Sequence, residues 1–195
     1  TINQPVRALG ASGQAQVLPA RAPAVVMDGV RVAHKVRTEA AARARELVAL
    51  RGRPPGLAVV QVGEDRASSV YVRNKRRKCQ EVGIESIAHD LPADTTETQL
   101  LRLIDELNRE ERVDGILVQL PLPAGLGVNR IMDAIDPAKD VDGFHSINTG
   151  LLAQRRPRLR PCTPYGVIRL AQEYGIALPG VRATVVGDST IVGRP

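Results

Sequence analysis

Two side chains that could act together on a substrate are Tyr71 and Lys75, which stand four residues apart in the stretch SSVYVRNKRRKCQEVGI, residues 68–84. On a helix this spacing places both side chains on one face, about one turn apart. The phenol ring offers a flat stacking surface, and the ammonium offers a charge or a proton. Such pairs also occur on exposed helical faces, so the pair alone does not establish a site.

A third side chain suited to chemistry is Gln119, which directly follows the apolar residues 116–118 in DGILVQLPLP. A glutamine amide both donates and accepts hydrogen bonds, so Gln119 can orient Lys75 or contact the edge of a heterocycle. Its simpler role is to end a buried strand, which Pro121 and Pro123 prevent from continuing.

Two carboxylates, Asp140 and Asp142, occur in the glycine-containing stretch PAKDVDGFH, residues 137–145. Aspartate in such a loop usually serves as a turn or capping residue. In the functional alternative, one of the two carboxylates accepts a pair of N–H bonds from an amino-pyrimidine edge, for which a carboxylate is the matching acceptor. The residue pattern by itself leaves open which role each aspartate takes.

A glycine-rich turn follows an apolar run in VRATVVGDSTIVGRP, residues 181–195. A strand that runs into such a turn is the opening of a nucleotide-binding βαβ unit. The spacing here is G-x-S-x-x-x-G instead of G-x-G-x-x-G, so the motif alone is a weak signal. The candidate cofactor-binding residues are Gly187, Asp188, Ser189, Ile191, Val192 and Gly193.

The elements that must position these residues alternate along the chain. Apolar residues at helical spacing predict helices over residues 30–50, 68–84, 96–111 and 128–135. Apolar runs predict strands over residues 57–62, 86–91, 116–118 and 181–186. The stretch PCTPYG predicts another helix, with Thr163 as its N-cap and Pro164 at its first position. The alternation indicates an open parallel α/β sheet, in which ligands bind at the carboxyl ends of strands.

Composition narrows the classes of function. The formal charge of +6 favours an acidic partner, and the densest basic run, residues 73–78, is either a solvated helix face or a means of attracting an anion. One Phe, three Tyr and no Trp make base stacking on nucleic acid an unattractive hypothesis. Cys79 and Cys162 lie far apart without CxxC spacing, which argues against a disulfide scaffold or a metal site and favours a reducing cytoplasm. We expect no membrane span.

In this order, the motifs YVRNKRRKCQEVGI, DGILVQLPLP, KDVDGFH, PCTP and VVGDSTIVGRP closely resemble those of the bifunctional methylenetetrahydrofolate dehydrogenase/cyclohydrolase family, over residues 26–195. The resemblance implies NADP- or NAD-dependent oxidation of 5,10-methylenetetrahydrofolate, hydrolysis of the methenyl product to 10-formyltetrahydrofolate, and a place in one-carbon metabolism and purine biosynthesis. It also implies that Tyr71 packs on the pterin, that Lys75 is the central catalytic group, that Gln119 hydrogen-bonds Lys75, and that Asp142 binds the pterin amino edge.

Residues 1–27 are rich in Ala, Gly, Pro and Gln and lack acidic residues before Asp28, which predicts a flexible extension, with an organelle transit peptide as the alternative. A folate-binding catalytic domain over residues 28–178 and the beginning of a Rossmann-type NAD(P)-binding domain over 179–195 would follow. A homodimer is usual in the family. This chain departs from the family at Asp188, where an arginine is common, and a carboxylate there should repel the 2′-phosphate of NADP. Two other hypotheses are a folate-binding relative without dehydrogenase activity and a basic nucleic-acid-binding protein.

Overall fold

A three-stranded parallel sheet lies at the centre of the structure, with the strands in the order β4-β3-β5. The structure is a computed structural model that describes residues 7–9, 15–17, 24–63 and 66–195, with side chains described over 24–63 and 72–195. The strands of the central sheet are β3 (Gly56–Val62), β4 (Glu85–Leu91) and β5 (Gly115–Val118). The helices are α1 (Gly29–Arg51), α2 (Arg66–Glu81), α3 (Glu97–Arg109), α4 (Val128–Ala134), α5 (Ser146–Ala153) and α6 (Cys162–Glu173).

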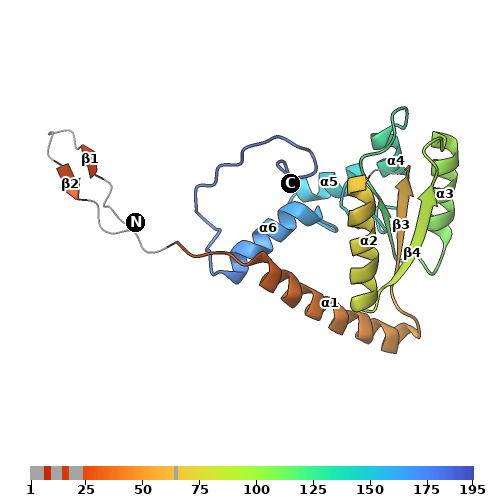
Figure 1. The fold of residues 1–195 in the computed structure, drawn as a ribbon, viewed down its shortest axis with the longest axis horizontal. Coiled ribbons are helices and arrows are strands. Elements are labelled where there is room, and N and C mark those ends of the chain that lie inside the picture. Colours follow the sequence, from red (N-terminus) through yellow and green to blue (C-terminus); the bar gives the residue numbers. More distant parts are fainter. Residues whose placement is uncertain (1–6, 10–14, 18–23, 64–65) are drawn as a thin grey trace.

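The sheet is covered on both faces, with α2 on one side and α3 on the other (Figure 1). The alternation of side chains along β3 separates two cores. Val60 packs with Ile104 of α3 and Ile131 of α4, whereas Val59 packs with Val72 of α2. The near-continuous burial of β3 and β5 follows from this arrangement, because a parallel strand between two helical layers has no solvent face. The predicted open parallel α/β sheet is confirmed.

Local sequence signals explain where two of the helices begin. The carboxylate of Asp28 accepts hydrogen bonds from the backbone N–H groups of Val30 and Arg31, at 2.9 and 3.0 Å, and so caps α1. At the start of α3, Thr96 and Gln99 form a reciprocal capping box. Each cap satisfies N–H groups that lack partners within the helix.

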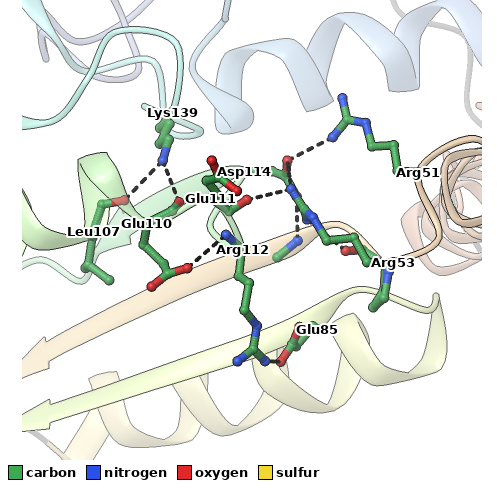
Figure 2. Close-up of polar contacts among 11 residues, drawn as sticks. Arg51, Arg53, Glu85, Leu107, Glu110, Glu111, Arg112, Asp114 and Lys139 are labelled. Atoms are coloured by element: carbon green, nitrogen blue, oxygen red, sulfur yellow. Dashed lines mark hydrogen bonds and ion pairs between the residues drawn. The ribbon is translucent and has the colours of Figure 1, made fainter.

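The amino ends of the strands are held together by a polar network that Figure 2 shows in close-up. Asp114, which precedes β5, accepts hydrogen bonds from Arg51, from Arg53 and from the backbone N–H of Gly56 at 2.9 Å. Arg53 Nη1 lies 2.7 Å from the Asp114 carboxylate. One carboxylate thus connects the end of α1, the start of β3 and the start of β5, at the sheet edge opposite to the one where ligands are expected.

Helix α6 is connected to α1 through polar side chains. The phenol oxygen of Tyr174 accepts a hydrogen bond from the backbone N–H of Asp28 at 2.6 Å. Glu173 pairs with Lys35 at 2.8 Å and with Arg169 at 2.9 Å. These contacts join the carboxyl end of α6 to the amino-terminal half of α1, and Figure 1 shows the two helices diverging from that point.

Two expectations about elements need correction, and one helix was not expected. Helix α6 begins at Cys162 with Pro161 in the N-cap position, so Thr163 is not the cap. Residues 181–186 form no strand, because none of the described strands pairs with them, and Val186 is 96% exposed. Helix α5 was not predicted, since only one of its residues, Asn148, is buried and its apolar pattern is weak.

Residues 1–27, predicted to be a flexible extension, lie largely outside the described residues. Within them, β1 (Arg7–Leu9) pairs antiparallel with β2 (Ala15–Val17). No helix in the part of the chain that the structure describes is long and apolar enough to cross a bilayer. No group of three His, Cys, Asp or Glu side chains converges as metal ligands among the same residues.

Candidate active site

The central contact of the candidate site is a hydrogen bond between Lys75 and Gln119. The ammonium Nζ of Lys75, in α2, donates to Oε1 of Gln119 at 3.1 Å. Gln119 directly follows β5, and its backbone N–H continues the ladder by donating to Val60 at 2.8 Å. The sheet therefore fixes the backbone of Gln119, and α2 brings the lysine to it from 44 residues away in the sequence.

The amide of Gln119 is oriented by a second bond. Its Nε2 donates to the carbonyl oxygen of Leu120 at 2.6 Å, so Oε1 is the atom left to face Lys75. Both side chains are half-buried, which leaves the ammonium accessible to a ligand. One N–H of the Lys75 ammonium is thus bonded to Gln119, which fixes the orientation of the ammonium. Its two other N–H groups remain as donors, as a proton-transferring or anion-binding group requires.

Tyr71 lies in α2, four residues before Lys75. Its side chain lies outside the part of the chain whose side chains are described. Its stacking role therefore stays a prediction.

Asp142 lies in the electrostatic field of Lys75 and is half-buried. Burial raises the pKa of its carboxyl above the ordinary value, and the negative charge of Asp140 adds to the rise, while Lys75 opposes it. Cys162, at the start of α6, approaches the same loop, since its Sγ lies 3.6 Å from the carbonyl oxygen of Val141. Burial and the Asp142 and Asp140 carboxylates raise the pKa of this thiol, so Cys162 does not have the properties of an activated nucleophile.

Asp140 and Asp142, which the residue pattern alone did not distinguish, occupy different environments. Asp140 is 1% exposed, and its carboxylate accepts hydrogen bonds from the backbone N–H groups of Phe144 and His145 and from the side chain of Asn148. Asp140 is therefore a buried structural acceptor, and Asp142 is the carboxylate near Lys75. No local signal distinguished them, because both occur in the same short loop.

The basic run in α2 carries less free charge than its sequence suggests. Arg76 is bonded to Asp90 of β4, and Lys78 lies 2.6 Å from Glu81. Arg77 lies 3.7 Å from the same glutamate. Three cations of the run thus face carboxylates of the chain itself, which reduces the charge available to attract an anionic ligand.

The glycine-rich turn has the compactness expected of a phosphate-binding loop. Gly187 has a φ of 129°, which favours glycine, and a Cβ at Gly193 would lie 2.5 Å from the carbonyl oxygen of Gly187. The carbonyl of Ser189 accepts hydrogen bonds from the N–H groups of Gly193 and Arg194, both at 3.0 Å. A cavity of about 930 Å³ lies between this turn and α6. Of the other predicted residues, Val192 lines this cavity, and Ile191 donates its N–H to Ser189 Oγ at 3.3 Å.

Asp188 has a partner that changes the prediction about the cofactor phosphate. Arg194 binds its carboxylate through two hydrogen bonds of 2.8 and 2.7 Å. This pairing lowers the pKa of Asp188, so the carboxylate stays ionised, and it also places a compensating positive charge beside it. The expected repulsion of a 2′-phosphate is reduced accordingly.

Two family models match the chain. The first, described as the tetrahydrofolate dehydrogenase/cyclohydrolase catalytic domain, matches residues 27–142, and the second, the NAD(P)-binding domain of the same enzymes, matches residues 161–195. An α/β domain with a strand-end lysine site and a following glycine-rich turn is thus of the folate dehydrogenase class. The chain belongs to the tetrahydrofolate dehydrogenase/cyclohydrolase family.

Solved structures agree with this assignment. The bifunctional methylenetetrahydrofolate dehydrogenase/cyclohydrolase of Campylobacter jejuni is 40% identical, with a TM-score of 0.84 over 87% of this chain and 60% of that one. A 5,10-methylenetetrahydrofolate dehydrogenase of the silkworm Bombyx mori is 40% identical, with a TM-score of 0.85 over 88% and 59%. The Trypanosoma brucei enzyme, complexed with NADP and an inhibitor, is 35% identical, with a TM-score of 0.82 over 87% and 58%. The chain spans about 60% of the length of these relatives.

Proposed function

We propose that this protein acts in folate one-carbon metabolism, oxidising 5,10-methylenetetrahydrofolate with NADP or NAD and hydrolysing the methenyl product to 10-formyltetrahydrofolate. The observation that carries the proposal is the Lys75–Gln119 hydrogen bond of 3.1 Å beside the half-buried Asp142. The bond orients one ammonium at the carboxyl end of β5, and this ammonium acts electrostatically on the Asp142 carboxylate. A folate offers an amino-pyrimidine edge to the carboxylate and a reacting carbon to the ammonium.

Hydrolysis requires that protons be moved. Water adds to the methenyl carbon, and its oxygen loses both protons as it becomes the formyl oxygen. A ring nitrogen gains one proton when its bond to that carbon breaks, so one proton is released overall. Lys75 is the group that transfers the proton, and Gln119 directs its Nζ. Tyr71 stacks against the pterin, as the resemblance implies, and restricts the substrate to one orientation.

Asp142 binds the pterin through its carboxylate, which must be ionised to accept two N–H bonds. Because its pKa is raised, the acceptor is lost as the pH falls through that raised value. Substrate affinity should therefore decline on the acid side at a higher pH than an ordinary aspartate would give.

NADP or NAD, when bound, accepts the hydride from the methylene carbon. The residues that would hold the cofactor are those of the turn, Gly187 to Gly193, with Asp188, Ser189, Ile191 and Val192 between the two glycines. The close approach of Gly193 to Gly187 and the adjoining cavity fit a phosphate group. Arg194 supports NADP as the first choice, because it offsets the charge of Asp188.

The remaining expectations are proposed on the same basis. A folate substrate, a homodimer, a cytoplasmic location and a supply of one-carbon units for purine biosynthesis agree with the family. Nucleic acid is not proposed as a partner, because aromatic residues for base stacking are few. A membrane is not proposed as a partner either. A folate-binding protein without dehydrogenase activity is the second candidate, favoured by the absence of a strand over residues 181–186.

The test is the decrease in methenyltetrahydrofolate absorbance with this chain, measured above the spontaneous rate, for the wild type and for Lys75→Met. We expect hydrolysis by the wild type and a loss of at least about a hundredfold in the variant. Lys78→Met is the matched control, since Lys78 lies in the same helix but binds Glu81. Full activity of Lys75→Met would refute the role of the lysine. A separate assay with NADP and with NAD distinguishes the dehydrogenase from the folate-binding alternative.

A further inference from the structure

The loop that carries Asp142 is closed by one buried carboxylate. Asp140 Oδ1 accepts from the backbone N–H of Phe144 at 3.3 Å, and Oδ2 accepts from that of His145 at 2.9 Å. The backbone carbonyl of Asp140 also accepts from the N–H of Gly143 at 3.2 Å. Residues 141–143, with Asp142 in the middle, therefore form a turn whose two ends are bonded to the same aspartate.

Asp140 itself is fixed from two directions. Asn148 of α5, which is fully buried, donates its Nδ2 to Asp140 Oδ2 at 2.8 Å. On the other side the backbone of Asp140 forms a parallel bridge with Ile116 of β5, and the N–H of Ile116 donates to Lys139 at 2.7 Å. The turn is thus attached both to the sheet and to α5.

The outer side of the turn is closed by close backbone contact. Gly143 has a φ of 68°, and a Cβ there would lie 2.8 Å from the carbonyl carbon of Arg160 and 2.9 Å from the nitrogen of Pro161. The thiol of Cys162 approaches Val141 from the same segment. The turn is therefore packed between β5 and α5 on one side and the start of α6 on the other, which leaves Asp142 little freedom to move.

We propose that Asp140 is a positioning residue, which holds the Asp142 carboxylate in the direction that folate binding requires. The inference rests on the proposed function of Asp142 and names a second residue for the same site. Asp140 does not touch the substrate. It acts through the two backbone N–H groups that close the turn and through the negative charge that it places near Asp142.

The charged and titratable groups around Asp142 define the electrostatic part of this role. Lys75 faces it from α2, Cys162 faces it from α6, and Asp140 is the like charge from its own loop. Burial and Asp140 raise the pKa of Asp142, whereas Lys75 lowers it. Removal of the Asp140 charge should therefore lower the pKa of Asp142 and move the acid-side loss of substrate affinity to lower pH.

The first test is Asp140→Asn in the full chain, assayed with methenyltetrahydrofolate. The substitution keeps the shape of the side chain but replaces one carboxylate oxygen by an NH2 group. That NH2 group faces an N–H donor, from Phe144 or His145, and cannot accept its hydrogen bond. We expect KM to rise about tenfold, while kcat changes less than about threefold, because Asp142 contributes binding and Lys75 is untouched. A general loss of folded protein would instead lower kcat at unchanged KM, and that result would overturn the proposal.

The matched control is Asp136→Asn. Asp136 is exposed in the preceding turn, where its carboxylate accepts only from Ala138 among the hydrogen bonds of the structure, at 2.7 Å. We expect KM within twofold of the wild type for this variant. An equal rise in KM in both variants would show that any loop aspartate has the effect, and would also contradict the proposal.

A second readout needs no folate activity. NMR titration of the Asp142 carboxyl in the wild type and in Asp140→Asn should show a lower midpoint in the variant, and hydrogen exchange at the amides of Phe144 and His145 should accelerate at least about tenfold. An unchanged midpoint with unchanged exchange would refute the positioning role. An inactive wild type together with the expected NMR changes would instead reject the proposed function and keep the inference about the turn.

Discussion

Replacement of Gln119 by methionine would test the chemistry of the site most directly. Methionine has nearly the same length and volume, but it lacks the strong acceptor that Oε1 presents to Lys75 Nζ at 3.1 Å. Its thioether also cannot donate to the carbonyl of Leu120, which now receives Nε2 at 2.6 Å. The backbone bond from Gln119 to Val60 is independent of the side chain, so the strand end should remain in place.

The expected size of the effect follows from that lost acceptor. A hydrogen bond to a charged group contributes about 1.5–3 kcal/mol when it is buried. Lys75 is half-buried, and water can replace part of the interaction, so we take the lower value of about 1.5 kcal/mol. If the bond directs the ammonium in the transition state, this energy corresponds to a decrease of about tenfold in kcat.

The assay is steady-state hydrolysis of methenyltetrahydrofolate, with the melting temperature of each variant as the measure of folding. Gln80→Met is the control, because Gln80 is exposed in the same helix as Lys75 and its side chain makes no hydrogen bond among those that the structure describes. A kcat within twofold of the wild type for Gln119→Met would refute the idea that Gln119 directs the lysine. A similar loss in Gln80→Met would attribute the effect to the assay conditions.

Three further predictions concern stability and the cofactor. Asp114→Asn should lower the free energy of unfolding by about 2 kcal/mol at neutral pH. Because Arg53 lowers the pKa of Asp114 below its ordinary value of 3.8, this contribution is complete above pH 3.8 and is lost as the pH falls through the lowered pKa. Urea unfolding at several pH values would measure it. Gly143→Ala should cost about 2–3 kcal/mol in the same experiment, because alanine disfavours the φ of 68° at this position and its Cβ would lie 2.8 Å from the carbonyl carbon of Arg160, closer than van der Waals contact. An equally stable variant would contradict the close contact. Arg194→Ala should weaken NADP binding about fivefold more than NAD binding, since Asp188 then lacks its partner, and an unchanged ratio of the two dissociation constants would count against that reasoning.

The sequence predicted the main elements well where the signal was local and strong. The apolar run of β3 is found where it was expected, and the helix predicted over residues 96–111 is found as α3 over Glu97–Arg109. The convergence of Lys75 and Gln119 was also predictable, because a residue after a central strand and a residue on the helix covering that strand meet at one edge of the sheet. The roles proposed for these residues stay predictions until the activity assays are made.

Other features depended on contacts that are distant in sequence. The predicted cap at Thr163 followed a local rule, but Gly143 packs against Arg160 and Pro161, and the helix begins directly after this contact. The strand predicted over residues 181–186 required a neighbouring strand, since a single apolar run has no partner for its backbone groups. Helix α5 begins at Ser146 with His145 as its N-cap, whose Nδ1 accepts from the N–H of Ile147, and histidine is not among the usual capping residues.

The formal charge of the chain could be predicted from the sequence, but the pairing of individual charges in the fold could not. Formal charge is countable from the sequence, but the part available to a ligand depends on which carboxylates lie nearby. Arg76 is bonded to Asp90 on the adjacent strand, so it is already compensated, whereas Asp140 adds a like charge next to Asp142 that no spacing rule would detect. At the candidate site, Lys75 lies near Asp142, and the pKa of Asp142 is raised by burial and by Asp140. Together these charges create a small, asymmetric electric field. That field, and not the abundance of basic residues, is what would distinguish a bound folate from any other anion at this site.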